Sequence, residues 1–561
     1  MRDPLASVSA RATPQTRPIP GRTDQVRNAA GGYVFAKDDW TRLEDFLILG
    51  TTGGTYYTDA EALTAANADV LFAAIAADGP RVVQLITGIA TARPARAPKP
   101  RPYLFALAAA TAQGDPATVQ AVKHAFPAVV RTTDHLATFF GYWKNLAGKQ
   151  SARGTQPVIG RAMRTALASW FNADQDVHAV ALRALKARQR ATPAGESLAL
   201  RDIIRIAHPA GRTEAHRALI GWLAGKVSDD DTRARLRDVD DFLTAQAVST
   251  ADEAVGVIRQ RSVPWEFLPS AVLGYAQVWD ALIDTVGLTA LIRNLARMTR
   301  LGTLGPFTGE ATGRVVARLT DASALAAARI HPMDLYLALK AYQSGISRTG
   351  PRRIGRRLPG AGSQGQEWQP VGAICDALET AYDLSFQAAT PSGKRLLVAV
   401  DCSGSMAGGW MVVSGGSPLG TPYEVANAIA VLFARIEPDL HVIEVDTQVH
   451  RSRVTPRANL REVAGWRPAG GGTDLSLPFT WAQRKKLAVD GFVVLTDNET
   501  WAGRAHPSQA LHAYRRTVNS DARVIVVSMT AVGYTIADPK DDGVLNVAGL
   551  DAALPTLITG Y

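Results

Sequence analysis

Oxygen-bearing side chains follow short apolar runs in the last third of the chain. The run 395–400 (RLLVAV) leads into an Asp-x-Ser-x-Ser motif, 491–496 (GFVVLT) into an aspartate, and the glycine-rich stretch 470–472 into a threonine. Carboxylate and hydroxyl oxygens are hard ligands that suit Mg²⁺ or Mn²⁺ in an octahedral shell. We therefore predict a divalent metal site. Its five ligands are Asp401, Ser403, Ser405, Thr473 and Asp497.

The first three of these residues alternate along the chain, so their oxygens can point to one side of a tight loop. Because serine and threonine hydroxyls are neutral, the cation would keep net positive charge and could accept an acidic group from a partner. A plainer interpretation is that Asp401 and Ser403 only cap the helix that follows.

The elements around these residues alternate between strand and helix. Strand-like runs, mostly apolar and β-branched, are separated by helical segments, which is typical of a doubly wound parallel sheet covered on both faces. In such sheets the ligand site lies beyond the carboxyl ends of the strands. The predicted strands are 395–400, 441–445, 491–496 and 523–529, and the predicted helices are 424–436, 478–487 and 507–516.

The first two thirds of the chain predict helices instead. From residue 40 to 345, apolar residues recur at helical spacing, with breaks at glycine and proline. Many medium-length helices with short breaks favour stacked pairs, which curve into an arch or ring, over one compact bundle. A stretch rich in Gly, Pro and Arg, 346–365, reads as a linker.

Composition limits the remaining choices. A chain of 561 residues exceeds one core, and its two cysteines, Cys375 and Cys402, are expected to be free thiols. Residues 1–23 lack an apolar signal-peptide core and predict a disordered basic arm. With no run of about 18 apolar residues, we expect no membrane span and a cytoplasmic location.

Positive charge is concentrated in the helical part. Residues 1–370 carry 45 Lys and Arg against 32 Asp and Glu, a balance of +13, whereas the remaining 191 residues carry 16 against 19, a balance of −3. Basic surfaces attract polyanions by counterion release, although many soluble proteins are basic without such a partner. Two candidate nucleic-acid patches are Arg161, Arg164, Lys186, Arg188 and Arg190, and Arg201, Arg205 and His208.

Lys186 and Arg190 are four residues apart, so they would share a helix face and gain from a phosphate between them. Alternatively, these cations only solvate a surface helix, and His208, next to Pro209, has a structural role. Three catalytic motifs are absent: the chain has no G-x-S-x-G, Walker A or H-E-x-x-H sequence. We therefore expect a protein that is not an enzyme.

Longer stretches resemble one family. Residues 28–57 (NAAGGYVFAKDDWTRLEDFLILGTTGGTYY) resemble the opening of the TROVE module, found in Ro autoantigen, telomerase-associated and vault proteins. Residues 393–406 (GKRLLVAVDCSGSM) and 494–500 (VLTDNET) resemble a von Willebrand factor A domain with its metal-ion-dependent adhesion site. The resemblance runs from about residue 24 to the C-terminus and is of the Ro type, with the composition of a bacterial relative.

This resemblance implies a multidomain α + α/β protein. A HEAT-like helical ring, the TROVE domain, would span 24–365, and the A domain would span 366–561. The family's ring takes single-stranded 3′ ends of misfolded non-coding RNA, and its outer surface binds Y-type small RNA; Lys186, Arg190 and His208 resemble family positions that contact RNA. Expected partners are Y-like RNA, misfolded RNA or ribosomal RNA precursors, and an exoribonuclease bridged by RNA, with the protein itself a monomer.

Two other function classes stay open. The A domain could dock acidic proteins through its metal while the basic half is only structural, or a catalytic triad assembled in space could make a hydrolase. Nucleic acid that co-purifies with the protein from its host would favour the RNA-binding hypothesis.

Overall fold

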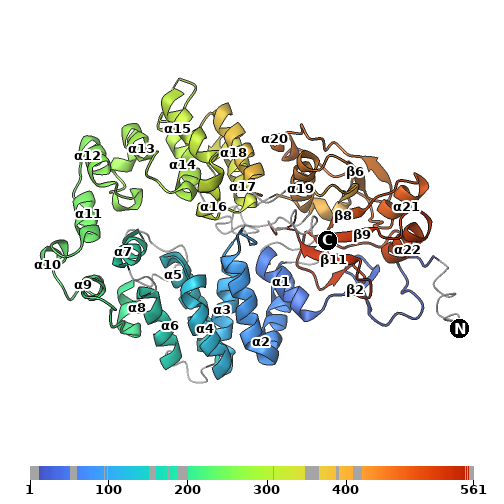
Figure 1. Cartoon of the computed structure of the whole chain (residues 1–561), viewed down its shortest axis with the longest axis horizontal. Coiled ribbons are helices and arrows are strands. Elements are labelled where there is room, and N and C mark those ends of the chain that lie inside the picture. The colour runs from blue at the N-terminus through green and yellow to red at the C-terminus, as the bar shows by residue number, and fades with distance from the viewer. Residues whose placement is uncertain are drawn as a thin grey trace, which may run out of the picture.

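The computed structural model describes residues 12–554, with gaps. The residues left undescribed inside this range are 51–59, 94, 98, 151–159, 173–175, 187–199, 308, 348–365, 387–390, 409–419, 550 and 552–553. The fold has two parts, a curved stack of helices and a domain built on a six-stranded sheet (Figure 1).

The helices of the first part pack against neighbours along the chain, so that α2 lies beside α3 and α4, and α3 beside α5. They run in one row from α1 to α8, turn at α9 to α11, and return in a second row to α18 (Figure 1). The predicted helical stack is thus confirmed. The helices are α1 (Asp39–Leu49), α2 (Ala60–Thr91), α3 (Arg101–Gln113), α4 (Pro116–Val129), α5 (Thr133–Gln150), α6 (Arg161–Phe171), α7 (Val177–Lys186), α8 (Leu200–Ala207), α9 (Glu214–Leu223), α10 (Asp229–Arg233), α11 (Arg237–Gln246), α12 (Ala251–Arg261), η2 (Trp265–Phe267), η3 (Val272–Gly274), α13 (Ala276–Leu282), α14 (Leu288–Arg300), α15 (Gly309–Leu319), α16 (Ala322–Ala328), α17 (Pro332–Gln343) and α18 (Gly372–Leu384).

Local sequence explains where helices begin and bend. The Asp38 carboxylate accepts the N–H groups of Trp40 and Thr41 and so caps α1. Helix α2 kinks at Asp78, whose backbone is not helical, just before Pro80. One stretch of this helix, Asn67–Thr91, is long and apolar enough to cross a membrane, but 44% of its most apolar window is buried inside the protein.

The second part is the predicted doubly wound sheet, with strand order β11-β9-β8-β5-β6-β7. All neighbouring strands are parallel except the edge strand β7. Alternate residues of β5 face two different cores, one containing α19 and the other containing α21 and α22. Its elements are β5 (Leu396–Asp401), η4 (Gly404–Ala407), α19 (Pro422–Ile436), β6 (Leu440–Val445), β7 (Val449–Arg451), α20 (Leu460–Val463), α21 (Leu477–Arg484), β8 (Gly491–Thr496), α22 (Pro507–Thr517), β9 (Arg523–Ser528), β10 (Tyr534–Thr535) and β11 (Val544–Ala548).

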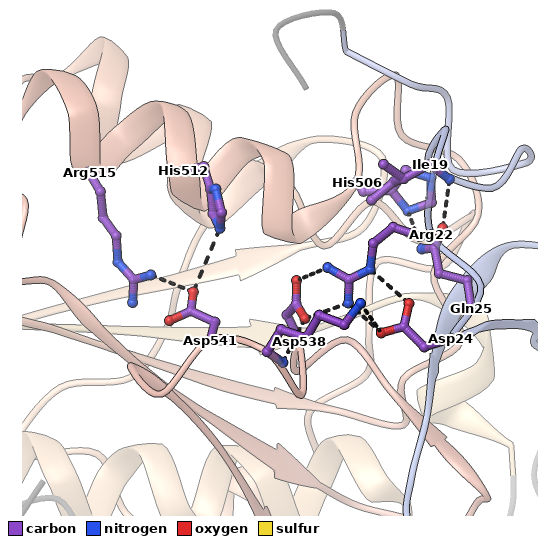
Figure 2. A network of polar contacts seen from close by, with 10 residues as sticks. Ile19, Arg22, Asp24, Gln25, His506, His512, Arg515, Asp538 and Asp541 are labelled. Carbon is purple, nitrogen blue, oxygen red and sulfur yellow. Dashed lines mark hydrogen bonds and ion pairs between the residues drawn. The ribbon is translucent and has the colours of Figure 1, made fainter. Parts of the chain in front are cut away.

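The N-terminal segment, residues 12–36, belongs to the sheet domain in space. Strands β1 (Gln25–Arg27) and β2 (Tyr33–Ala36) form a hairpin, and β2 also pairs with β10. Arg22 lies between Asp24 and Asp538, with nitrogen–oxygen distances of 2.6 to 2.7 Å (Figure 2). The prediction of a disordered arm is therefore wrong for residues 12–23, because their polar groups find partners some 500 residues later; residues 1–11 lie outside the described part.

The boundary between the two parts also differs from the predicted one at residue 365. Helix α18 packs on α15, α16 and α17, so it belongs to the helical stack, and the sheet begins only with β5. A short antiparallel pair, β3 (Ile346–Ser347) with β4 (Gln366–Glu367), brackets the predicted linker, most of which lies outside the described residues.

Polar contacts join the start of the helical stack to the end of the chain. The Arg96 Nε donates to the Asp551 carboxylate at 2.7 Å, and Lys99 pairs with Asp334 of α17. Lys37 and Asp45 form a buried ion pair of 2.6 Å, with side chains 1% and 4% exposed. These contacts hold the first and last helices beside the same sheet domain (Figure 1).

Candidate functional site

The predicted metal ligands lie at the carboxyl ends of β5 and β8, the central strands of the sheet. Asp401 is the last residue of β5, and Asp497 directly follows β8. Because these parallel strands pair in register, with Val400 opposite Leu495, their ends reach the same edge. Both aspartates are at most 1% exposed. The sheet has thus brought two carboxylates together where a doubly wound fold binds its ligands.

A chain of hydrogen bonds connects these ligands. The Ser403 N–H donates to Asp401 Oδ1 at 3.0 Å, and the hydroxyls of Ser403 and Ser405 lie 3.1 Å apart. The Ser405 side chain in turn hydrogen-bonds Asp497. The second oxygen of Asp401 accepts the hydroxyl of Thr496 at 2.7 Å. Four of the five predicted ligands therefore form one contiguous polar cluster.

Thr473, the fifth predicted ligand, lies on a loop that is tied to both strand ends. The Gly470 N–H donates to the Cys402 carbonyl at 3.0 Å, and the Gly404 N–H donates to the Gly471 carbonyl at 3.1 Å. The positive φ of Gly470 (85°) and Gly471 (95°) lets this loop turn so closely. The residue Thr473 is 1% exposed, so it is buried on this loop.

The electrostatics of this cluster fit a bound cation. Burial, followed by the charges of Asp401 and Glu499, raises the pKa of Asp497 well above its ordinary value. Burial also raises the pKa of Asp401. Two buried carboxylates this close repel one another when both are ionised, and a divalent ion between them would offset the repulsion. All donors are oxygens, as Mg²⁺ and Mn²⁺ prefer.

The N-terminal segment supports the loops that carry Thr473 and Asp497. No sequence signal indicated this support. The Gln15 side chain donates to Asp474 at 2.9 Å and accepts the hydroxyl of Thr500 at 2.6 Å. The Asn28 Nδ2 donates to the Thr500 carbonyl at 2.8 Å. Gly32 packs so closely that an added Cβ would lie 1.9 Å from that same carbonyl oxygen. Residues after Thr473 and Asp497 are therefore fixed by a segment from the other end of the chain.

The predicted nucleic-acid residues that the structure describes lie on α6, α7 and α8. Arg161 and Arg164 are three residues apart on α6, which packs against α8. These two, together with Lys186 at the end of α7 and Arg205 on α8, are exposed, and none forms an ion pair with a described acidic residue. The structure thus places four exposed cations on α6, α7 and α8 that have no acidic partner among the described residues.

The other predicted positions in these patches differ in environment. Arg188 and Arg190 lie outside the described residues, so the expected pairing of Arg190 with Lys186 stays a prediction. The Arg201 Nε donates to the Ala224 carbonyl at 3.1 Å, so this side chain holds the end of α9. His208 directly follows α8, with a φ of 47° and an exposed side chain, in line with the expected position near a helix end.

A further arginine cluster has no counterpart among the predicted residues. Burial, then the charges of Arg131 and Arg93, lower the pKa of Arg329. Among the described residues, the Nε of Arg131 and an Nη of Arg329 are buried and find no hydrogen-bond partner. These residues follow α4, α2 and α16, which are far apart in the sequence, so no local pattern could have found them. Several guanidinium charges that act on one another, with no ion pair to a described carboxylate, favour binding of an anion.

Comparisons with known proteins identify the family. A family model described as the Ro60 vWA domain matches residues 395–561, and the TROVE domain model matches residues 257–348. RNA-binding protein RO60 of Deinococcus radiodurans is 34% identical over 564 residues, covering 100% of this chain and 99% of the relative. RNA-binding protein RO60 of Caenorhabditis elegans is 29% identical over 604 residues, covering 95% of this chain and 89% of the relative.

The same family appears among solved structures. The crystal structure of the Deinococcus radiodurans RO (RSR) protein matches with a TM-score of 0.65 at 34% identity, covering 93% of this chain and 99% of that one. The helical stack and the von Willebrand factor A sheet match the solved structure, and the sequence matches a relative along its whole length. This chain therefore belongs to the RO60 family.

Proposed function

We propose that this protein binds RNA through the helical part and acts as a scaffold rather than an enzyme. One observation carries the proposal: α6, α7 and α8 bear exposed cations that have no acidic partner among the described residues. The relatives that match along the whole length of this chain are named RNA-binding proteins. Cations without carboxylate partners are free to contact phosphates, and each contact releases counterions from the RNA.

Two kinds of RNA contact are proposed. Duplex RNA is recognised mainly by its backbone and shape, so Arg161, Arg164 and Arg205 suit a small structured RNA of the Y-like class. The cluster of Arg93, Arg131 and Arg329 suits the backbone of a single-stranded 3′ end, such as that of a misfolded non-coding RNA or ribosomal RNA precursor. An RNA-quality-control role in the cytoplasm, as a monomer joined to an exoribonuclease through RNA, follows as part of this proposal.

The test measures affinity against salt for a structured RNA with and without a single-stranded tail. We expect Arg161→Ala/Arg164→Ala/Arg205→Ala to weaken binding of both RNAs and to reduce the slope of log affinity against log salt by about two. A matched control, Arg484→Ala/Lys485→Ala/Arg516→Ala, removes three exposed cations from the ends of α21 and α22. Equal losses in both triple variants, or binding that is flat with salt, would contradict the proposed surface.

We further propose that Asp401, Ser403, Ser405, Thr473 and Asp497 hold Mg²⁺ or Mn²⁺. The proposal is supported by their shared oxygen chemistry and by the two buried carboxylates, whose repulsion a cation would offset. When bound, the ion would supply a positive site for an acidic group of a partner.

Thermal unfolding of metal-free and Mg²⁺-loaded protein tests this site. A ligand at about 100 times its Kd stabilises the folded state by about 2.7 kcal/mol. We expect this gain in the wild type and none in Asp497→Asn, whereas the metal-free variant should be at least as stable as the metal-free wild type. An undiminished Mg²⁺ response in Asp497→Asn would remove that residue from the ligand set.

A further inference from the structure

Cys402, Asp446 and His450 form a second group of possible ligands beside the oxygen cluster. The thiol sulfur, a carboxylate oxygen and a ring nitrogen all lie within 4.8 Å of one another. We propose that these three residues form a binding site for a borderline transition-metal ion of the Zn²⁺ class, distinct from the site that would hold Mg²⁺.

The sheet itself produces this convergence. Strands β5 and β6 are parallel and pair Asp401 with Val445, so the next residues, Cys402 and Asp446, leave the sheet together. The Cys402 N–H donates to the Val445 carbonyl at 2.8 Å, which continues the pairing by one residue. Because side chains alternate along strands, both residues continue the face of the sheet that carries Glu444.

The tight turn from β6 to β7 supplies the third residue. Strand β7 runs antiparallel to β6 and pairs His450 with Glu444, which puts the imidazole on the same face. The His450 Nε2 lies 2.9 Å from Asp446 Oδ1, and this oxygen also accepts the Gln448 N–H at 2.7 Å. The carboxylate is therefore oriented by backbone before any metal arrives, as is common for metal ligands.

The distances are close to those of a three-ligand zinc site. Zn–S bonds are about 2.3 Å and Zn–N and Zn–O bonds about 2.0–2.2 Å, so ligand atoms at tetrahedral angles lie roughly 3.3–3.7 Å apart. The His450 and Asp446 atoms need to separate by a few tenths of an ångström, and the sulfur needs to approach by at most about 1 Å. The imidazole is 36% exposed, so solvent can reach the site and water could serve as the fourth ligand.

The charges around the thiol favour a cation. The carboxylates of Asp401, Glu444 and Asp446 all act on Cys402, so several negative groups surround the thiol. An ion bound through the thiolate would release the thiol proton to solvent and partly neutralise these carboxylates. A thiolate and an imidazole are ligands that Mg²⁺ does not select, so the two sites would bind different ions.

The experiment titrates metal-free, full-length protein with Co²⁺ while Mg²⁺ saturates the oxygen site. Co²⁺ replaces Zn²⁺ in such sites and reports a thiolate ligand through near-ultraviolet charge-transfer absorption. We expect this band in the wild type, its loss in Cys402→Ser, and an affinity at least about tenfold weaker in His450→Ala. His450 is half-exposed, so its variant should keep the fold even if Cys402→Ser does not.

Two control variants distinguish this site from the second thiol and from the oxygen cluster. Cys375→Ser changes the other buried free thiol, and Asp497→Asn changes only the oxygen site; both should keep the band. Absence of the band in the wild type, its persistence in Cys402→Ser, or its loss in Cys375→Ser would overturn the proposal. In the first two outcomes, Asp446 and His450 are simply a hydrogen-bonded pair and Cys402 fills the core.

Discussion

The buried pair of Lys37 and Asp45 allows one prediction to be worked out from the structure. Lys37 directly follows β2, and its ammonium group contacts Asp45 of α1 at 2.6 Å and the Ser528 hydroxyl of β9 at 3.2 Å. Two neighbouring segments and a strand 491 residues later thus meet at one cation. We predict that Lys37→Met strongly destabilises the protein, because it leaves the Asp45 carboxylate buried without a counter-charge.

Removing one member of a buried ion pair costs about 3–5 kcal/mol. For a domain the size of the sheet domain, this corresponds to a fall in Tm on the order of 10 °C. Burial already raises the pKa of Asp45, and a raised carboxyl pKa opposes folding only where the group is ionised. The loss in Lys37→Met should therefore be full near neutral pH and should shrink as the pH falls towards about 4, where Asp45 is protonated.

The assay is chemical denaturation of the wild type, Lys37→Met and Lys37→Met/Asp45→Asn at several pH values. The double variant removes the uncompensated charge, so it should recover most of the stability lost in the single variant. A loss below about 1 kcal/mol in Lys37→Met, or a loss that does not change with pH, would refute the reasoning.

Three further predictions concern other parts of the molecule. Burial, then the charge of Arg131, lowers the pKa of His135 to about 4. The wild type should therefore lose about 3 kcal/mol of stability between pH 6.5 and 4, and His135→Gln should lose less over that range. Parallel acid-unfolding curves of the two proteins would contradict this prediction. Gly32→Ala should reduce the free energy of unfolding by about 1–3 kcal/mol and weaken Mn²⁺ binding, because the new Cβ would meet the Thr500 carbonyl of a ligand loop. An unchanged Tm and Mn²⁺ affinity would argue against this close contact. Arg22→Ala should reduce the free energy of unfolding by about 1–3 kcal/mol, because Asp538 loses the guanidinium that pairs with it (Figure 2). Proteolysis of residues 12–36 should also become faster than in the wild type.

Local sequence was enough to predict the sheet and most of the oxygen cluster. Apolar runs that end in Asp401 and Asp497 indicate strand ends, and parallel strand ends must meet at one edge. The same rule applies to the predicted strand at 441–445, which leads into Asp446, a residue that was not among the predicted ligands. His450 could not be placed from sequence, because its position depends on the register of a hairpin.

Contacts between distant segments could not be predicted. The segment around Gln15 is polar and rich in proline, and this local composition by itself indicates disorder. Its order comes from partners such as Asp474 and Thr500, and nothing in a single sequence records that pairing. The cluster of Arg93, Arg131 and Arg329 is likewise a product of the curvature of the stack.

Because the N-terminal segment, residues 12–36, packs on the sheet domain, it affects how the chain folds during synthesis. Thr13 bonds to Gln509, a partner made 496 residues later. At about 5–20 residues per second, a ribosome needs roughly 25–100 s to cover that distance. Residues 12–36 must therefore wait for these partners until the sheet domain has been translated, so final docking of this segment is a late event on the nascent chain.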